Sequence, residues 1–212
     1  MRKQLRFVAF GDSLTVGFQS QTSDSFLPQT TPYTDFLKQE VETMLAELGR
    51  AEAFRVQFHN RGVCGELTSD MLLRFKQDVV YLKPSHVVIL GGSNDIGWDV
   101  VAEEVFSNLK EMYWEAEENG IEPIACTVPS ILGFDMYIQP RMELSRLIMK
   151  YCHDRGVRCV DLFKATSNPK TNRLLEEYSN DGLHLSTRGY RKVAETIWSE
   201  AVEEIIAASL KE

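Results

Sequence analysis

The stretch Phe7–Thr15, FVAFGDSLT, is an apolar run of strand character that stops abruptly at a Gly-Asp-Ser turn. Gly11 permits the sharp change of chain direction, and Ser13 places a small hydroxyl where the strand ends. In a parallel α/β protein the carboxyl ends of the strands open onto the ligand crevice, so Ser13 is a candidate nucleophile. Taken alone, the tripeptide is more typical of an ordinary turn in which Asp12 or Ser13 caps a backbone amide.

The rest of the chain alternates between strand-like and helix-like segments. The expected strands cover residues 5–10, 53–58, 86–90, 121–128 and 157–162, and the expected helices cover residues 32–49, 69–82, 100–119, 141–154 and 187–210. The run His86–Leu90 is apolar almost throughout, as expected of a central parallel strand that is buried on both faces. Strands that alternate with helices predict an α/β fold, a three-layer α/β/α sandwich around a five-stranded parallel sheet.

Length and composition favour one soluble domain that covers residues 1–212. The 212 residues are 43% hydrophobic, which is enough to bury a full core. The formal net charge of −8 argues against a nucleic-acid partner, because contacts to phosphates need clustered Lys and Arg. No apolar run approaches the roughly 18 residues of a membrane span, and the run after Met1–Arg6 is too short for a signal peptide. The sequence gives no indication of an oligomeric state.

The four cysteines form no CxxC pair, and Cys126 falls inside an apolar strand-like run. Buried free thiols in a reducing compartment are therefore expected, which together with the missing signal peptide predicts a cytoplasmic protein. Cys64 differs from Cys126, Cys152 and Cys159 because it lies in a Gly-rich loop, Asn60–Gly65.

The segment Asp181–His184, DGLH, lies just before the last expected helix and is a candidate acid–base pair. An Asp and a His three residues apart across a Gly can set the carboxylate against Nδ1 of the imidazole and leave Nε2 free to take a proton. A hydroxyl nucleophile requires this arrangement of its base and its orienting acid. The alternative is a solvated turn in which Asp181 only caps the helix that begins at Thr187.

An acyl-transfer site also needs hydrogen-bond donors directed at the oxyanion that develops on the carbonyl. The backbone amides of Ser13 and Gly65 are candidates, the latter because a glycine lets the backbone approach a ligand closely. Asn94 follows the strand 86–90 in a Gly-rich turn and offers a side-chain amide. Each loop alone is more typical of a simple turn, but that interpretation leaves their joint occurrence at strand ends unexplained.

Four blocks of the sequence, taken in order, resemble the four motif blocks of the GDSL, or SGNH, hydrolases. They are Gly11–Leu14, Gly65 within Asn60–Gly65, Gly92–Asp95 and Asp181–His184. The motifs are short, but the four together are highly specific, and the resemblance spans about residues 7–190. It implies a flavodoxin-like sandwich of five parallel strands that hydrolyses an ester or thioester bond through an acyl-enzyme.

The resemblance also implies a role for each matching position. The catalytic residues would be Ser13 as nucleophile, His184 as base and Asp181 as its orienting acid. The oxyanion hole would consist of Ser13, Gly65 and Asn94. The resemblance implies no metal and no cofactor.

Other enzyme families fit the motifs less well. An Asp such as Asp12 also follows the first strand of haloacid-dehalogenase-type phosphatases, but these need a second Asp where this chain has Leu14. The resemblance gives Asp12 only the role of holding the turn. An α/β-hydrolase needs a G-x-S-x-G elbow, which Gly11–Thr15 does not supply. A thiol enzyme built on Cys64 and His184 is a further alternative, although the resemblance gives Cys64 only a place in a supporting loop.

The resulting prediction is a serine esterase that acts on a small-molecule ester, with short acyl or acetyl esters preferred. A lysophospholipase or an acyl-CoA thioesterase that uses the same site is one alternative. A non-catalytic carbohydrate- or lipid-binding module is the alternative from another class, and it would be expected to lack Ser13, Asn94 or His184. None of the three is missing.

Two loops, residues 18–31 and 129–140, are expected to shape the substrate pocket. Four large side chains near them are expected either to line a slot for a short acyl chain or to belong to the core. They are Trp98, Phe134, Met136 and Tyr137.

Overall fold

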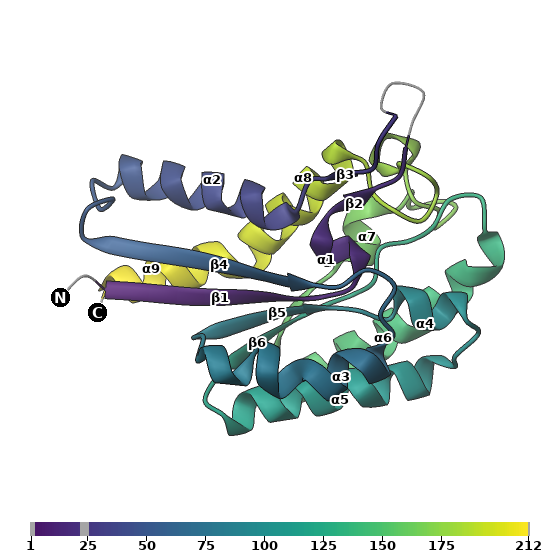
Figure 1. Ribbon diagram of the computed structural model, residues 1–212, viewed down its shortest axis with the longest axis horizontal. Coiled ribbons are helices and arrows are strands. Elements are labelled where there is room, and N and C mark those ends of the chain that lie inside the picture. The colour runs from purple at the N-terminus through teal and green to yellow at the C-terminus, as the bar shows by residue number, and fades with distance from the viewer. Residues whose placement is uncertain (1–2, 22–25, 212) are drawn as a thin grey trace.

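The computed structural model describes residues 3–21 and 26–211, and within these residues five parallel strands form the central sheet (Figure 1). The strands are β1 (Lys3–Gly11), β4 (Phe54–Gly62), β5 (His86–Leu90), β6 (Glu122–Cys126) and β7 (Arg158–Val160). Their order across the sheet is β4-β1-β5-β6-β7. This is the strand order of flavodoxin-like doubly wound folds, so the predicted fold class is confirmed.

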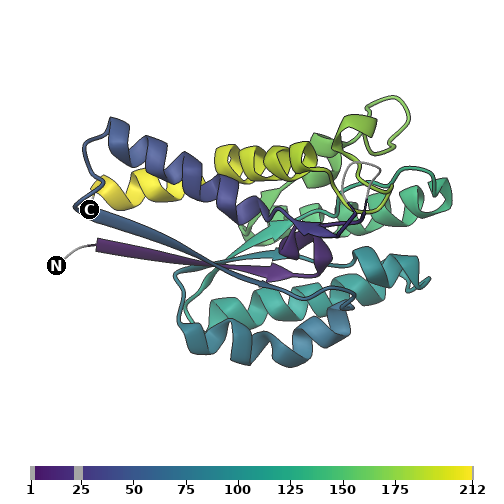
Figure 2. The same ribbon diagram turned by 45° about the horizontal axis from the view of Figure 1, so that its top comes forward.

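Helices cover both faces of the sheet, and Figures 1 and 2 show the layers from two directions. One face carries α2 (Tyr33–Glu47), α8 (Thr187–Ile197) and α9 (Glu203–Lys211), and a π-helical turn, Trp198–Val202, joins α8 to α9. The opposite face carries α3 (Thr68–Asp78), α5 (Ala102–Glu118) and α6 (Ile138–Arg155). Single 3₁₀ turns lie at Val80–Leu82, Asp135–Tyr137 and Glu176–Tyr178.

β1 is buried on both faces because its side chains alternate between two separate cores. Phe7 and Ala9 belong to the core beneath α2, α8 and α9. Val8 and Phe10 belong to the core beneath α3, α5 and α6. None of the four is more than 1% exposed, so the strand that leads into the Gly-Asp-Ser turn is held from both sides.

Shorter elements gather at the carboxyl edge of the sheet (Figure 1). They are α1 (Ser13–Val16) after β1, α4 (Ser93–Gly97) after β5, α7 (Leu162–Thr166) after β7, and the antiparallel pair β2 (Phe18–Gln19) and β3 (Gln29–Thr30). Since the strands of the sheet are parallel, the loops that follow them lie along this one edge, where such folds bind their ligands.

Several boundaries differ from the expected ones. β4 continues past residue 58 to Gly62, because it stays in register with β1 over its whole length, so the expected loop Asn60–Gly65 is half strand. The helix expected from residue 141 begins at Ile138, since a first helical turn tolerates Pro140. Residues 22–25 of the expected pocket loop 18–31 lie outside the described residues. Over residues 3–21 and 26–211, no helix is both long enough and apolar enough to span a bilayer.

Candidate active site

The Gly-Asp-Ser turn lies where β1 leaves the sheet. A Cβ on Gly11 would lie 2.1 Å from the carbonyl oxygen of Leu90 in β5, so only glycine allows the two strands this close approach. Asp12 caps α1, since its Oδ1 accepts a hydrogen bond of 2.9 Å from the amide of Leu14. Ser13 begins α1 and is 6% exposed. The turn therefore places the Ser13 hydroxyl at the carboxyl edge of the sheet.

His184 contacts both Ser13 and Asp181. Its Nε2 is 3.2 Å from Oγ of Ser13, and its Nδ1 is 2.8 Å from Oδ2 of Asp181. When the carboxylate accepts the proton of Nδ1, Nε2 is left as the acceptor for the serine hydroxyl. The structure thus brings the predicted nucleophile, base and orienting acid into contact, in the arrangement that nucleophilic catalysis by serine requires.

The carboxylate of Asp181 also folds the loop that carries it. Its Oδ1 accepts hydrogen bonds from the amides of Leu183, at 3.0 Å, and His184, at 2.7 Å. Helix α8 has a different cap, because Oγ of Ser186 accepts a hydrogen bond of 3.2 Å from the amide of Gly189. The alternative in which Asp181 only caps this helix is therefore wrong.

Asp181 is ionised at neutral pH. Partial burial raises the pKa of its carboxyl, but hydrogen bonds from Ser20 and His184 outweigh burial and bring the pKa down to about 2. The carboxylate is therefore available to pair with the imidazole. Ser20 was not among the predicted site residues.

The two other predicted oxyanion donors lie on neighbouring elements. Gly65 lies in the loop between β4 and α3 with a φ of +80°, and its Cα faces open space. Asn94 is the second residue of α4, and its Nδ2 donates a hydrogen bond of 2.9 Å to the carbonyl oxygen of Glu66. The amide nitrogen carries two hydrogens, so one remains for a ligand. The Glu66 carbonyl thereby ties the Asn94 side chain to the loop that carries Gly65.

A buried hydrogen-bond cluster joins α4 to the first residue of α3. Asp95 in α4 is 2% exposed, and its carboxylate accepts hydrogen bonds from the amide of Thr68, at 3.0 Å, and from its hydroxyl, at 2.6 Å. Burial raises the pKa of Asp95, although the bonds from Thr68 oppose the rise. Sequence reasoning placed Asp95 in a motif block without giving it a role, because its partner lies 27 residues away.

Arg74, on α3, contacts three segments behind the site. Its guanidinium donates to the carbonyl oxygens of Gly11, at 3.1 Å, and Arg61, at 3.0 Å, and forms ion pairs with Glu66 and Asp78. It thereby joins the ends of β1 and β4 to the loop that carries Gly65. Sequence reasoning missed this residue, since a charged side chain on an amphipathic helix is typical of a solvated face.

Asp12 lies outside the contacts between nucleophile, base and acid. It is fully buried, and burial raises the pKa of its carboxyl to about 7, against the opposing effects of the Leu14 amide and the Arg141 charge. Arg141 is 1% exposed and donates to Oγ of Ser93 and the carbonyl of Pro129, both at 2.9 Å. The structure therefore gives Asp12 the turn-holding position expected for it.

A cavity of about 260 Å³ adjoins these residues. Its lining consists of Ser93, Asn94, Gly97, Trp98, Ile131, Phe134, Tyr137, Arg141 and Leu183. Loop 129–140 thus contributes to a pocket whose lining also includes Asn94 and Leu183, the residue before His184. Three of the four side chains expected at a slot line this cavity, and the fourth, Met136, is exposed outside it.

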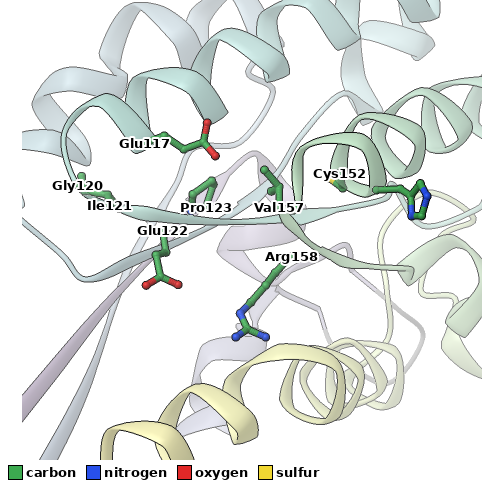
Figure 3. A pocket seen from close by; sticks show the side chains of 10 residues that line it. Glu117, Gly120, Ile121, Glu122, Pro123, Cys152, Val157 and Arg158 are labelled. Carbon is green, nitrogen blue, oxygen red and sulfur yellow. The ribbon is translucent and has the colours of Figure 1, made fainter. Parts of the chain in front are cut away.

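A cavity of about 800 Å³ lies at the opposite edge of the sheet (Figure 3). It is formed where α5 and α6 end and where β6 and β7 begin, with Glu117, Glu122, Cys152 and Arg158 among its lining residues. None of the predicted site residues lines it. Volume alone therefore does not locate the site in this fold.

The surroundings of the cysteines do not favour a thiol enzyme. Cys64 is exposed, Cys126 and Cys152 are buried, Cys159 is partly buried, and all four are free thiols. Although Cys64 is exposed as a residue, desolvation of its thiol and the nearby Asp12 charge raise the pKa of that thiol, which disfavours the reactive thiolate. Among the residues that the structure describes, no three His, Cys, Asp or Glu side chains are grouped so that they could hold a metal ion.

A flavodoxin-like sheet with these groups at its carboxyl edge is the architecture of the class of SGNH hydrolase folds. Within that class, the chain belongs to the GDSL-like lipase/acylhydrolase family, whose model matches residues 9–192. Among curated proteins, it is 33% identical to an uncharacterized lipoprotein, YqeF of Bacillus subtilis, over 133 residues, which are 59% of this chain and 49% of that one. The chain spans about half the length of this relative.

Solved structures share the fold over nearly the whole chain. The lipase/acylhydrolase from Enterococcus faecalis has a TM-score of 0.70 and 26% identity, over 92% of this chain and 94% of that one. A putative lipolytic protein of the G-D-S-L family from Desulfitobacterium hafniense has a TM-score of 0.68 and 23% identity, over 90% and 96%. A catalytic mutant of an acetylxylan esterase from Geobacillus stearothermophilus has a TM-score of 0.75 and 20% identity, over 94% and 96%.

Proposed function

We propose that this chain is a serine esterase that hydrolyses carboxylic esters through an acyl-enzyme on Ser13. The 3.2 Å contact of Ser13 with His184, continued by the 2.8 Å contact of His184 with Asp181, carries the proposal. His184 takes the proton of the Ser13 hydroxyl while Oγ attacks the ester carbonyl. Asp181 orients the imidazole and stabilises its protonated form.

The carbonyl oxygen becomes an oxyanion, which accepts hydrogen bonds from the amides of Ser13 and Gly65 and from Nδ2 of Asn94. As the tetrahedral intermediate collapses, the bond to the alcohol breaks and His184 returns the proton to the leaving oxygen. A water molecule then attacks the acyl-enzyme and gives its proton to His184. The acid leaves as Ser13 recovers its proton, and the scheme needs no metal or cofactor.

The Ser13→Ala variant tests the proposal with p-nitrophenyl acetate as substrate. We expect kcat to fall by at least about 10⁴-fold, because the nucleophile is removed, while circular dichroism shows an unchanged fold. Labelling by a fluorophosphonate should be lost as well. The matched control is Ser199→Ala, because Ser199 is an exposed residue on the π-helical turn. Retained turnover in Ser13→Ala would refute the mechanism, and binding of esters without turnover by the native chain would favour a binding module.

We further propose that the 260 Å³ cavity holds a short acyl group. Pockets for drug-sized ligands are larger, at about 300–1,000 Å³. Trp98, Phe134 and Tyr137 give the cavity an aromatic lining next to the oxyanion donor Asn94. The acetylxylan esterase with the same fold acts on an acetylated substrate by its name, which supports a small acyl group here too.

A series of p-nitrophenyl esters from acetyl to palmitoyl measures this preference. We expect kcat/KM to be highest for acetyl or butyryl and to fall for longer chains, because a long chain does not fit the cavity. Acetylated sugars and an acyl-CoA, assayed beside the series, test which leaving group the site accepts, a sugar alcohol or a thiol. A maximum at palmitoyl would contradict the proposal in favour of a lysophospholipase, and a preference for the acyl-CoA would favour a thioesterase.

A further inference from the structure

Ser20 lies directly after β2 and contacts the orienting acid proposed above. Its Oγ donates a hydrogen bond to Oδ2 of Asp181, the same oxygen that lies 2.8 Å from Nδ1 of His184. Ser20 and Asp181 are 161 residues apart in the sequence. One carboxylate oxygen thus receives two donors, one from the base and one from the segment that follows α1.

Hydrogen bonds from both backbone and side-chain groups hold Ser20 in this place. Its amide donates to Oδ1 of Asn180 at 2.6 Å, and the amide of Asn180 donates to the carbonyl oxygen of His184 at 2.9 Å. The preceding residue, Gln19, donates to the hydroxyl of Thr187 at 3.1 Å. These bonds join the Ser20 segment to the loop that carries the acid and the base, so the Ser20 hydroxyl is not a free surface group.

The same segment also contacts the imidazole. The Phe18 ring meets the His184 ring at an angle of 64°, with the ring centroids 4.7 Å apart. The hydroxyl of Tyr190, in α8, holds Phe18 by donating a hydrogen bond of 2.8 Å to its carbonyl oxygen. The segment from Phe18 to Ser20 therefore contacts both the acid and the base.

A hydroxyl that donates to a carboxylate stabilises its charged form. Burial raises the pKa of Asp181, and Ser20 supplies the largest of the hydrogen-bond effects that lower it. The Ser20 hydroxyl therefore helps to keep Asp181 ionised, so that the carboxylate can accept the Nδ1 proton of His184.

We propose that Ser20 is a positioning residue of this site: it holds the Asp181 carboxylate against the imidazole, so that Nε2 of His184 stays directed at Ser13. The proposal rests on the function proposed above. Ser20 acts through Asp181.

The kcat and KM for p-nitrophenyl acetate, measured on the full chain, test the proposal. In Ser20→Ala, kcat should fall by roughly tenfold while KM changes little, since a hydrogen bond that orients the charged Asp181 is lost. Ser20→Thr keeps a hydroxyl and should restore the native kcat. Ser20→Cys, a weaker donor of similar size, should give an intermediate kcat and serves if the alanine variant does not fold. The matched control is Gln21→Ala, because Gln21 bonds the carbonyl of Phe26 instead of Asp181.

A second readout does not depend on turnover. In the Ser13→Ala background, carbon-13 NMR of the Asp181 carboxyl should show a higher pKa when Ser20→Ala is added, because a hydrogen bond that lowers this pKa is lost. An unchanged kcat, a loss of kcat that Ser20→Thr does not restore, or an unmoved pKa of Asp181 would overturn the role of Ser20. These outcomes are distinct from failure of the proposed function, which would appear as retained activity in Ser13→Ala alone.

Discussion

Asn94 uses one hydrogen of its side-chain amide to bind the Glu66 carbonyl, and this bond determines where the other hydrogen points. With that hydrogen directed at the oxyanion, Asn94→Ala should lower kcat for p-nitrophenyl acetate by about 10²–10³-fold and change KM little, because the contact strengthens in the transition state. The control is Asn119→Ala, since the Asn119 side chain bonds the carbonyl of Glu115 near the end of α5. A loss of less than about tenfold would mean that other groups hold the oxyanion.

At the level of single residues, a site residue can be predicted from the sequence when a reactive side chain stands in a recognisable local pattern. Ser13 follows a glycine at a strand end, and Asp181 and His184 stand three residues apart, so each candidate could be named without the structure. Ser20 could not, because nothing near it in the sequence distinguishes it from other polar loop residues. Its partner is determined by tertiary contacts across 161 residues.

At the level of elements, Arg74 makes α3 a support for two strand ends. Arg74→Met keeps the length of the side chain but leaves the Glu66 carboxylate, whose side chain is 15% exposed, without its ion pair. We expect a loss of about 2–4 kcal/mol in the free energy of unfolding, measured with urea, and a lower kcat because the Gly65 loop loses its anchor. Arg74→Lys should recover only part of both losses, since it cannot reproduce the several donors of a guanidinium.

The comparison variant for this prediction is Arg146→Met. Arg146 pairs with Glu143 on the same helix, and the side chain of Arg146 is 59% exposed. Exposed pairs of this kind contribute little, so its loss should cost less than about 1 kcal/mol. Equal effects of the two substitutions would show that the Arg74 contacts have no special role.

Among the elements, the central strands were predictable because their side chains are apolar on both faces. The expected boundaries are wrong where contacts with other elements determine the start or end of an element. β4 extends to Gly62 because β1 supplies its hydrogen-bonding partners, which no pattern within β4 itself reveals. Short elements such as α4 and the β2–β3 pair contain too few residues for a period to be visible, and so they were expected as loops.

The stability of the whole molecule should depend on the charge of Asp12. Its pKa rises from 3.8 to about 7 on folding, so between these values the folded state holds a proton that the unfolded state has lost. The contribution of Asp12 to stability is therefore fully present below pH 3.8 and is lost as the pH rises through about 7, with a slope of up to about 1.4 kcal/mol per pH unit.

The variant Asp12→Asn isolates this effect because it keeps an oxygen for the Leu14 amide but cannot ionise. Urea unfolding of both proteins at a series of pH values should show the variant gaining stability relative to the native chain as the pH rises. Groups elsewhere in the molecule cancel in this difference. A difference that does not change with pH would contradict the raised pKa of Asp12.

The site takes its parts from the two sides of the sheet. The loop with Asp181 and His184 continues into Leu185, which belongs to the core beneath α2, α8 and α9. Asn94 lies on α4, whose Ile96 belongs to the core beneath α3, α5 and α6. Under the proposed mechanism, a change in the first core therefore acts on the acid and the base, whereas a change in the second core acts on the oxyanion donor Asn94.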